Sequence, residues 1–148
     1  MGVIATAAQE LARLDRLLTD RFDHLLSVEG ASVGQWHVLD SLAKTSGISM
    51  TKLSGDTGLT LPHLSKLVDR LVVNNLVYRR IDDADRRRVK LLLTPRGRNV
   101  HRQLSELLDR AELTLPEHVV HKLHQVGSLS QEIVSSLNGS DVAVQESR

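Results

Sequence analysis

Two short strand-like runs separated by a strongly basic tip restrict the fold of this sequence more than any other feature. The runs are Val77–Ile81 and Val89–Leu93, and the residues between them begin with turn-forming aspartates and end with three consecutive arginines. We therefore expect a β-hairpin, and its tip would carry Asp85, Arg86, Arg87 and Arg88. Between residues 79 and 102 there are nine basic and three acidic residues, although the net charge of the whole chain is only +1.

A cluster of guanidinium groups on a protruding hairpin is suited to binding DNA. Guanidinium is planar, permanently charged and weakly hydrated, which favours contact with phosphates and with a narrow groove. A solvated hairpin without a partner is the alternative interpretation. Aromatic residues make up only 2% of the chain, so it has little material for the base stacking that many single-strand and RNA binders use. Duplex DNA is therefore the favoured polyanion.

The residues before the hairpin predict two short helices joined by a tight turn. Ser49 would cap a helix that runs to about Thr57, and a second helix would run from about residue 61 to 74. The second helix buries apolar residues on one face, at three- and four-residue spacing. Its cap, N-terminus and opposite face present Thr60, Leu61, Pro62, His63, Ser65, Lys66 and Arg70. Two such helices followed by a basic hairpin form a winged helix-turn-helix, whose second helix enters the major groove.

Long amphipathic helices are expected on both sides of this region. The first covers about residues 5–27. After the hairpin, residues 94–95 begin another helix with a cap followed by proline at the first helical position. A break at residues 115–116 separates it from a last helix that ends near Asn138, and Gly127 would be a weak point or bend in that helix.

The expected fold class is mainly α (α+β), a winged helix-turn-helix with long N- and C-terminal dimerisation helices. A single domain would span residues 1–148, with dimerisation helices at 1–30 and 95–138, the winged helix-turn-helix at 33–94 and a frayed tail at 139–148. The outer helices carry apolar stripes that are too long for one small core to cover. These stripes include Leu14, Leu18, Val119, Leu123 and Ile133. They predict an obligate homodimer, whose two-fold symmetry would match a palindromic DNA site.

A series of short motifs follows the order and spacing of the MarR family of bacterial transcriptional regulators, which the chain resembles over nearly its full length. The motifs are Leu53–Thr60, Leu67–Leu71, Leu76–Arg80, Asp85–Arg87 and Leu93–Gly97. The sequence departs from the family pattern at Leu61 and Pro62, where small polar or basic residues are usual, and at Asn75, where glycine is usual. Asn75 can still adopt a left-handed helix C-cap, and an apolar Leu61 can still contact a thymine methyl group.

The resemblance implies a homodimeric regulator, more often a repressor, that binds a pseudo-palindromic duplex site. It also implies that Arg87 enters the minor groove while Asp85 braces its guanidinium. A small, aromatic and anionic effector would bind near Trp36, His37 and Asp40, between the helical dimer region and the winged domain. For Trp36 the alternative is that the indole simply fills the core. No cofactor is implied.

Two alternatives to a ligand-responsive regulator are open. A metal-responsive regulator of the same fold is suggested by His118, His121 and His124, because imidazoles three or four residues apart can share a metal. The chain has no cysteine, which removes thiol-ligated zinc, and we expect no metal site. The other alternative is a dimeric interaction module that has lost DNA binding. In such a module the hairpin, which forms the wing, would have lost its basic residues, and here they are present.

Enzymatic activity and membrane insertion are not expected. The sequence contains no Gly-rich phosphate loop, no nucleophile elbow and no metalloprotease helix signature. No segment approaches an uncharged membrane-spanning length, so the sequence predicts a cytoplasmic protein without a membrane partner.

Overall fold

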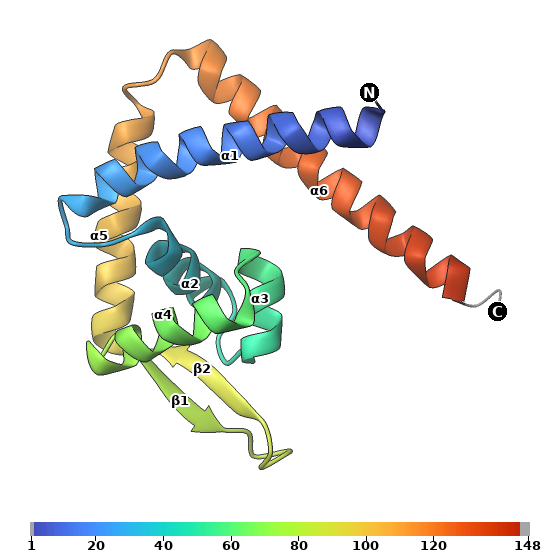
Figure 1. Cartoon of the computed structure of the whole chain (residues 1–148). Coiled ribbons are helices and arrows are strands. Elements are labelled where there is room, and N and C mark those ends of the chain that lie inside the picture. Colours follow the sequence, from blue (N-terminus) through green and yellow to red (C-terminus); the bar gives the residue numbers. More distant parts are fainter. Residues whose placement is uncertain (1, 146–148) are drawn as a thin grey trace. The chain divides into compact units, whose positions relative to one another are not determined.

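The computed structural model describes the backbone of residues 2–145 and the side chains of residues 2–139. Its elements are α1 (Val3–Ser27), α2 (Val33–Lys44), α3 (Met50–Thr57), α4 (Leu61–Val73), β1 (Val77–Ile81), β2 (Val89–Leu93), α5 (Pro95–Glu112) and α6 (Glu117–Gln145) (Figure 1). The chain divides into two compact units, Met1–Asp109 and Arg110–Arg148, where the sequence predicts a single domain. The division falls there because every residue of the hydrophobic core lies at or before Leu108.

The core of the first unit is contributed mainly by α2, α3, α4 and the hairpin β1–β2. Leu39, Leu53, Leu64 and Leu91 come one from each of these elements, and all four are fully buried. The buried positions of α4 lie at three- and four-residue spacing, as the sequence predicts. The same spacing leaves the opposite face of α4 exposed.

The helix-turn-helix follows the predicted boundaries closely, with one difference at a cap. The Ser49 hydroxyl accepts a hydrogen bond from the Lys52 N–H, and α3 ends at Gly58, which is left-handed at φ 70°. Thr60 occupies the N-cap position of α4, but its side chain makes no capping hydrogen bond. Pro62 explains this in part, because it removes one of the two backbone N–H groups that such a cap can engage.

The hairpin occupies the two predicted ranges and extends beyond the core. Its strands are antiparallel, with Val77 opposite Leu93, and both of these residues are buried. The rest of β1 is exposed, so the hairpin projects away from the helices of this unit (Figure 1). The Leu91 N–H donates to the Ile48 carbonyl at 2.8 Å, which covers the outer edge of β2 and leaves β1 as the open edge.

Thr94 joins the end of the hairpin to the start of α5. Its N–H donates to the Leu76 carbonyl at 3.0 Å, its hydroxyl donates to the Asn75 carbonyl at 2.6 Å, and the same oxygen accepts from the Gly97 N–H at 2.9 Å. Asn75 is left-handed, with φ 57°, as predicted for a C-cap. Gly97 lies so close to this turn that an added Cβ would be 2.0 Å from the Leu76 oxygen. The first turn of α5 is therefore held directly against the turn that follows α4.

Near its C-terminus, helix α1 is anchored to the core of its unit. Leu26 is buried, and the Asp23 carboxylate accepts a hydrogen bond from the Val33 N–H at 2.8 Å, at the start of α2. Toward the N-terminus, Leu11 and Leu17 are exposed. Most of α1 thus presents apolar side chains that the core of its own unit does not cover.

The second unit consists of the end of α5 and the whole of α6. The predicted break at residues 115–116 separates the two helices, but α6 continues through Gly127 without the predicted interruption. Helix α6 also continues to Gln145, so the frayed tail predicted at 139–148 is helical as far as the described backbone extends. No proline follows Asn138 to stop it. In residues 2–145, no helix combines the length and apolar composition that a membrane crossing requires.

The outer helices expose apolar side chains along the predicted stripes. Leu14, Leu18, Val119 and Leu123 are half-buried, and Ile133 is exposed. Among the exposed apolar side chains, those that expose more than half of their surface are Val3, Ile4 and Leu17 of α1 and Leu129, Ile133, Val134 and Leu137 of α6.

Gly97→Ala is expected to lower the free energy of unfolding by about 3 kcal/mol, because overpacking here sets a methyl group against a hydrogen-bonded backbone. Gly55→Ala is the matched control, since nothing lies within 4 Å of a Cβ at this position in α3. That change should stabilise the protein by about 0.5–1 kcal/mol. Chemical denaturation measures both, and equal effects would contradict the close contact at Gly97.

Candidate nucleic-acid interface

Aspartate side chains fold the tip of the hairpin. The Asp82 carboxylate accepts from the Ala84 N–H at 3.0 Å, and the Asp85 carboxylate accepts from the Arg87 N–H at 3.0 Å. The Arg88 N–H donates to the Asp85 carbonyl at 2.9 Å and closes the turn. Such hydrogen bonds over two residues are typical of aspartate in turns. The acidic residues of the tip thus determine where the arginine backbone lies.

Asp85 also faces two of the arginine side chains. Its carboxylate oxygens lie 3.6 Å from the Nε atoms of Arg87 and Arg88, one oxygen to each. The Arg87 side chain is 94% exposed, so its guanidinium extends into solvent. An exposed pair at this distance contributes little to stability, but it restricts the direction of both side chains. The predicted brace on Arg87 is therefore a carboxylate that Arg87 shares with Arg88.

Asp82 is held in its charged form at the base of the tip. The hydrogen bond from the Ala84 N–H lowers the pKa of the Asp82 carboxyl below its ordinary value, and Lys90, whose Nζ lies 3.4 Å away, adds to the effect. Lys90 is therefore paired within the hairpin. The exposed cations of the tip are Arg86, Arg87 and Arg88.

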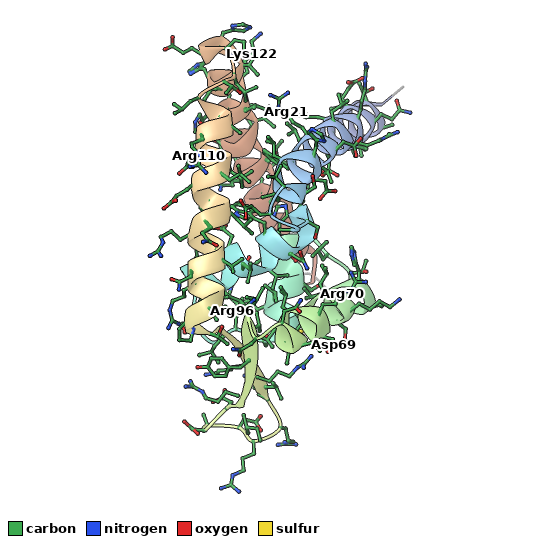
Figure 2. The ribbon with its side chains drawn as sticks, turned by 90° about the vertical axis from the view of Figure 1, so that its left-hand side faces the viewer. Arg21, Asp69, Arg70, Arg96, Arg110 and Lys122 are labelled. Atoms are coloured by element: carbon green, nitrogen blue, oxygen red, sulfur yellow. The ribbon has the colours of Figure 1, made fainter. Side chains whose placement is uncertain are left out.

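The outer face of α4 carries every residue that the sequence predicts for it. Leu61, Pro62, His63, Ser65, Lys66 and Arg70 are exposed, and so is Thr60 before them. Leu61 is 48% exposed, so an apolar surface is available at the start of the helix. Figure 2 labels Arg70 and Asp69 on α4, with Asp69 on the side nearer the hairpin. This face could reach the edges of bases in a major groove.

One contact between α4 and the hairpin was not predicted from the sequence. The Arg79 guanidinium of β1 donates from Nη2 to the Asp69 carboxylate at 2.5 Å. Both residues were visible in the sequence, Asp69 on the polar face of α4 and Arg79 in the basic segment. Strand alternation places Arg79 on the same face of the hairpin as the buried Val77, but the sequence does not show which residue of α4 this face meets.

The predicted effector residues form part of a cluster between α2 and α5. The rings of Trp36 and His101 are stacked with centroids 6.5 Å apart, and His37 meets Trp36 edge-on at 5.6 Å. The His101 Nε2 lies 3.1 Å from an Asp40 carboxylate oxygen, and the Lys44 ammonium lies 2.6 Å from the other. His101 was not predicted as a member of this site, since sixty-one positions separate it from Asp40.

Burial and charge act on this cluster in recognisable ways. Burial lowers the pKa of His37 below its ordinary value, against the opposing effect of Asp40 and Asp15. Burial raises the pKa of Asp40, but the hydrogen bonds from Lys44 and His101 outweigh it and hold that pKa below the ordinary value. The indole Nε1 of Trp36 is buried without a hydrogen-bond partner. Such an orphaned donor is uncommon in a protein interior.

The histidines of α6 do not converge. His118, His121 and His124 are exposed, and the His124 Nε2 lies 3.8 Å from a Glu112 carboxylate oxygen. Across the described side chains, residues 2–139, no three histidine, cysteine or acidic side chains come close enough together to hold a metal ion. The spacing of three therefore does not build the ligand set that the metal-responsive alternative requires.

A helix-turn-helix followed by a basic two-stranded hairpin defines the class of winged helix-turn-helix DNA-binding regulators. Residues 32–89 match the model of the MarR family. These residues include α2, α3, α4, β1 and the tip of the hairpin. The MarR family consists of transcription regulators and not of enzymes.

Solved structures of transcriptional regulators share the fold of the chain. BldR from Sulfolobus solfataricus is 25% identical with a TM-score of 0.73, covering 89% of this chain and 99% of that one. CouR, a transcriptional repressor bound to a 23-mer DNA duplex, is 24% identical with a TM-score of 0.70, covering 82% and 89%. BpsR from Bordetella bronchiseptica, whose DNA binding is regulated by 6-hydroxynicotinic acid, is 20% identical with a TM-score of 0.70, covering 83% and 91%. No curated protein sequence matches the chain.

The lowered pKa of His37 predicts a loss of stability in mild acid. The unfolded chain takes up a proton at this imidazole near pH 6.5, more readily than the folded protein does. The contribution of His37 to stability is therefore complete above about pH 6.5 and is lost as the pH falls through the lower pKa of the folded state. We expect His37→Gln to make the unfolding free energy less dependent on pH in this window. Urea denaturation at several pH values measures the unfolding free energy of both proteins. If its dependence on pH is the same in His37→Gln as in the wild type, His37 is not the group responsible.

Proposed function

We propose that the protein is a homodimeric, ligand-responsive transcriptional repressor that binds a pseudo-palindromic operator in duplex DNA. The observation that carries the proposal is the tip of the β1–β2 hairpin, which forms the wing and where the Asp85 carboxylate lies 3.6 Å from the Nε atoms of Arg87 and Arg88. The intact tip argues against an interaction module that has lost DNA binding. The DNA complex of CouR, a repressor of the same fold, supports the proposal by analogy.

In this proposal α4 reads the major groove and the wing enters the minor groove. Ser65, Lys66 and Arg70 would contact base edges, and Leu61 would contact a thymine methyl group. Thr60, Pro62 and His63 would lie along the backbone at the start of the helix. Arg86, Arg87 and Arg88 would follow the phosphates and the narrow groove, with Asp85 restricting their directions.

Substitutions in the wing and in α4 should have different consequences. Arg87→Ala should weaken binding to operator and unrelated DNA alike, because the minor groove offers little base identity. It should also flatten the slope of log affinity against log salt by roughly one unit for each phosphate that a subunit no longer binds. Ser65→Ala and Lys66→Ala should instead cost about 1–3 kcal/mol for each base that is no longer read on the operator, and less on unrelated DNA.

Fluorescence anisotropy on both DNAs at two salt concentrations measures these effects. Arg102→Ala is the matched control, because Arg102 is an exposed arginine on α5 whose one hydrogen bond is to Asn99, at 3.2 Å. An Arg87→Ala protein that is folded and keeps the wild-type affinity and salt slope would show that the wing is only a charged surface.

The proposed homodimer rests on the uncovered apolar faces of α1 and α6. Leu129, Ile133 and Leu137 expose more than half of their surface, and Leu17 of α1 does so too. Exposed apolar surface of this extent on long helices favours association. A two-fold dimer would also present two copies of α4 to two half-sites of the operator.

Light scattering at micromolar concentration should give the mass of a dimer. Ile133→Asp with Leu137→Asp should raise the dimer dissociation constant by at least roughly 30-fold, because each protomer loses the burial of two apolar side chains. Gln131→Asp, on an exposed position of the same helix, is the control for the added charge. A wild-type monomer at this concentration would contradict the proposal.

The proposed effector is a small, aromatic and anionic molecule that binds near Trp36, His37 and Asp40. The buried, unpartnered Nε1 of Trp36 supports this, because a carboxylate oxygen of the effector would accept its hydrogen bond. His101, stacked on Trp36, and Lys44 supply further donors. The DNA binding of BpsR, a protein of similar fold, is regulated by a molecule of this class. Such a molecule acts only if it binds the two conformations of the dimer with different affinity.

Titration with phenolic carboxylates should change the fluorescence of Trp36, the single tryptophan of the chain, and release operator DNA in parallel. Trp36→Phe keeps an aromatic ring and removes the N–H donor, and it is the control for operator release, since it has no tryptophan fluorescence to follow. If no compound in a broad panel changes either signal, Trp36 serves only to fill the core, against which it packs.

A further inference from the structure

The Asp69–Arg79 ion pair connects the two elements that would read DNA. We infer that Asp69 is a positioning residue, which acts through Arg79 to hold the wing at a set distance from α4. The inference rests on the proposed DNA-binding function. It goes beyond that proposal because Asp69 is assigned no contact with DNA.

The position of this pair on the hairpin lets it control the direction of the wing. Arg79 lies opposite Leu91, so it emerges from the face of the hairpin that is buried nearer the base. Beyond this level β1 is exposed, and the tip is supported by contacts within the hairpin itself. Within the described side chains, residues 2–139, the Asp69–Arg79 pair is the only side-chain hydrogen bond or ion pair that joins α4 to the hairpin. It is thus the outermost polar link between the two elements.

Neither stability nor DNA attraction explains a carboxylate at this position. The Asp69 side chain is 62% exposed and that of Arg79 is 42% exposed, and exposed ion pairs contribute little to folding. Asp69 is the single acidic residue of α4, on the face that also carries Lys66 and Arg70. A negative charge there repels phosphates and takes up one guanidinium that could bind them. Its benefit must lie elsewhere, and the contact it makes is with the wing.

A fixed distance between wing and helix matters for a protein that uses two grooves at once. The spacing of the grooves in duplex DNA is set by the duplex, so a wing held at the matching distance loses less conformational freedom on binding. A wing that can pivot would still bind phosphates through its arginines, since phosphate binding does not depend on register. Loss of the link should therefore weaken operator binding more than binding to unrelated DNA.

The experiment compares variants on two duplexes. One is selected by the wild-type protein from a randomised pool, and the other is an unselected duplex of equal length. In Asp69→Asn and Arg79→Gln, the ratio of affinities for selected over unselected DNA should fall about tenfold, since each dimer loses two links. In the double variant this ratio should be no lower than in either single variant, because both substitutions remove the same ion pair. Asp69→Glu, which can still reach Arg79, should keep the wild-type ratio.

A second readout locates the effect on the DNA. At saturating protein, Asp69→Asn should lose the minor-groove protection by the wing in hydroxyl-radical footprints and keep the protection of guanine N7 by α4 in dimethyl sulfate footprints. Asp56→Asn is the matched control, because it removes one carboxylate from an exposed ion pair with Lys52 on α3 and should leave both the ratio and the footprint unchanged. Melting temperatures confirm that each variant is folded.

The possible outcomes separate this inference from the proposed function. If Asp69→Asn strengthens binding to both duplexes equally and keeps the ratio, Asp69 is only a repulsive charge and the inference is wrong. If the ratio of affinities for selected over unselected DNA falls in Asp69→Asn but not in Arg79→Gln, Asp69 acts without Arg79, and the inference is also wrong. A wild-type protein that enriches no duplex from the pool overturns the proposed function, and the inference with it.

Discussion

The hydrogen bonds of Thr94 hold together the part of the protein on which the DNA-binding geometry depends. One residue bonds to Asn75 and Leu76, in the turn after α4, and to Gly97 in the first turn of α5. The end of α4, the hairpin and α5 therefore meet at a single small junction, in which glycine permits an approach that any side chain would prevent. The direction in which the hairpin leaves the core is set here.

Outside that junction, stability and function rest on different kinds of residue. Leucines and valines supply the buried core, while the hairpin beyond its first residues buries almost nothing. There, hydrogen bonds to carboxylates hold the hairpin in shape. Asp82 and Asp85 accept from backbone N–H groups of the tip, and Asp69 binds Arg79. The acidic residues of a basic surface thus give it a shape, at the cost of part of its attraction for DNA.

Most local elements could be predicted from the sequence, because their signals are local. Both strands, α3 and α4 follow from caps, turn residues and apolar spacing within a few positions. Thr60 lies at the predicted cap position of α4 but makes no capping hydrogen bond, in part because Pro62 removes a donor, and α6 continues past its predicted end, through Gly139. The Asp69–Arg79 and Trp36–His101 contacts could not be predicted, since they depend on angles between elements that only the packed core determines.

The open edge of β1 has a consequence for how copies of the protein meet in solution. Ile48 covers the outer edge of β2, but the backbone groups along the outer edge of β1 are free to pair with a strand of another molecule. β1 is short and carries Arg79 and Arg80 in succession, so two such edges would bring four guanidinium groups together. The basic composition of the wing therefore also protects the sheet against edge-to-edge aggregation, a hazard that a neutral hairpin of the same shape would face.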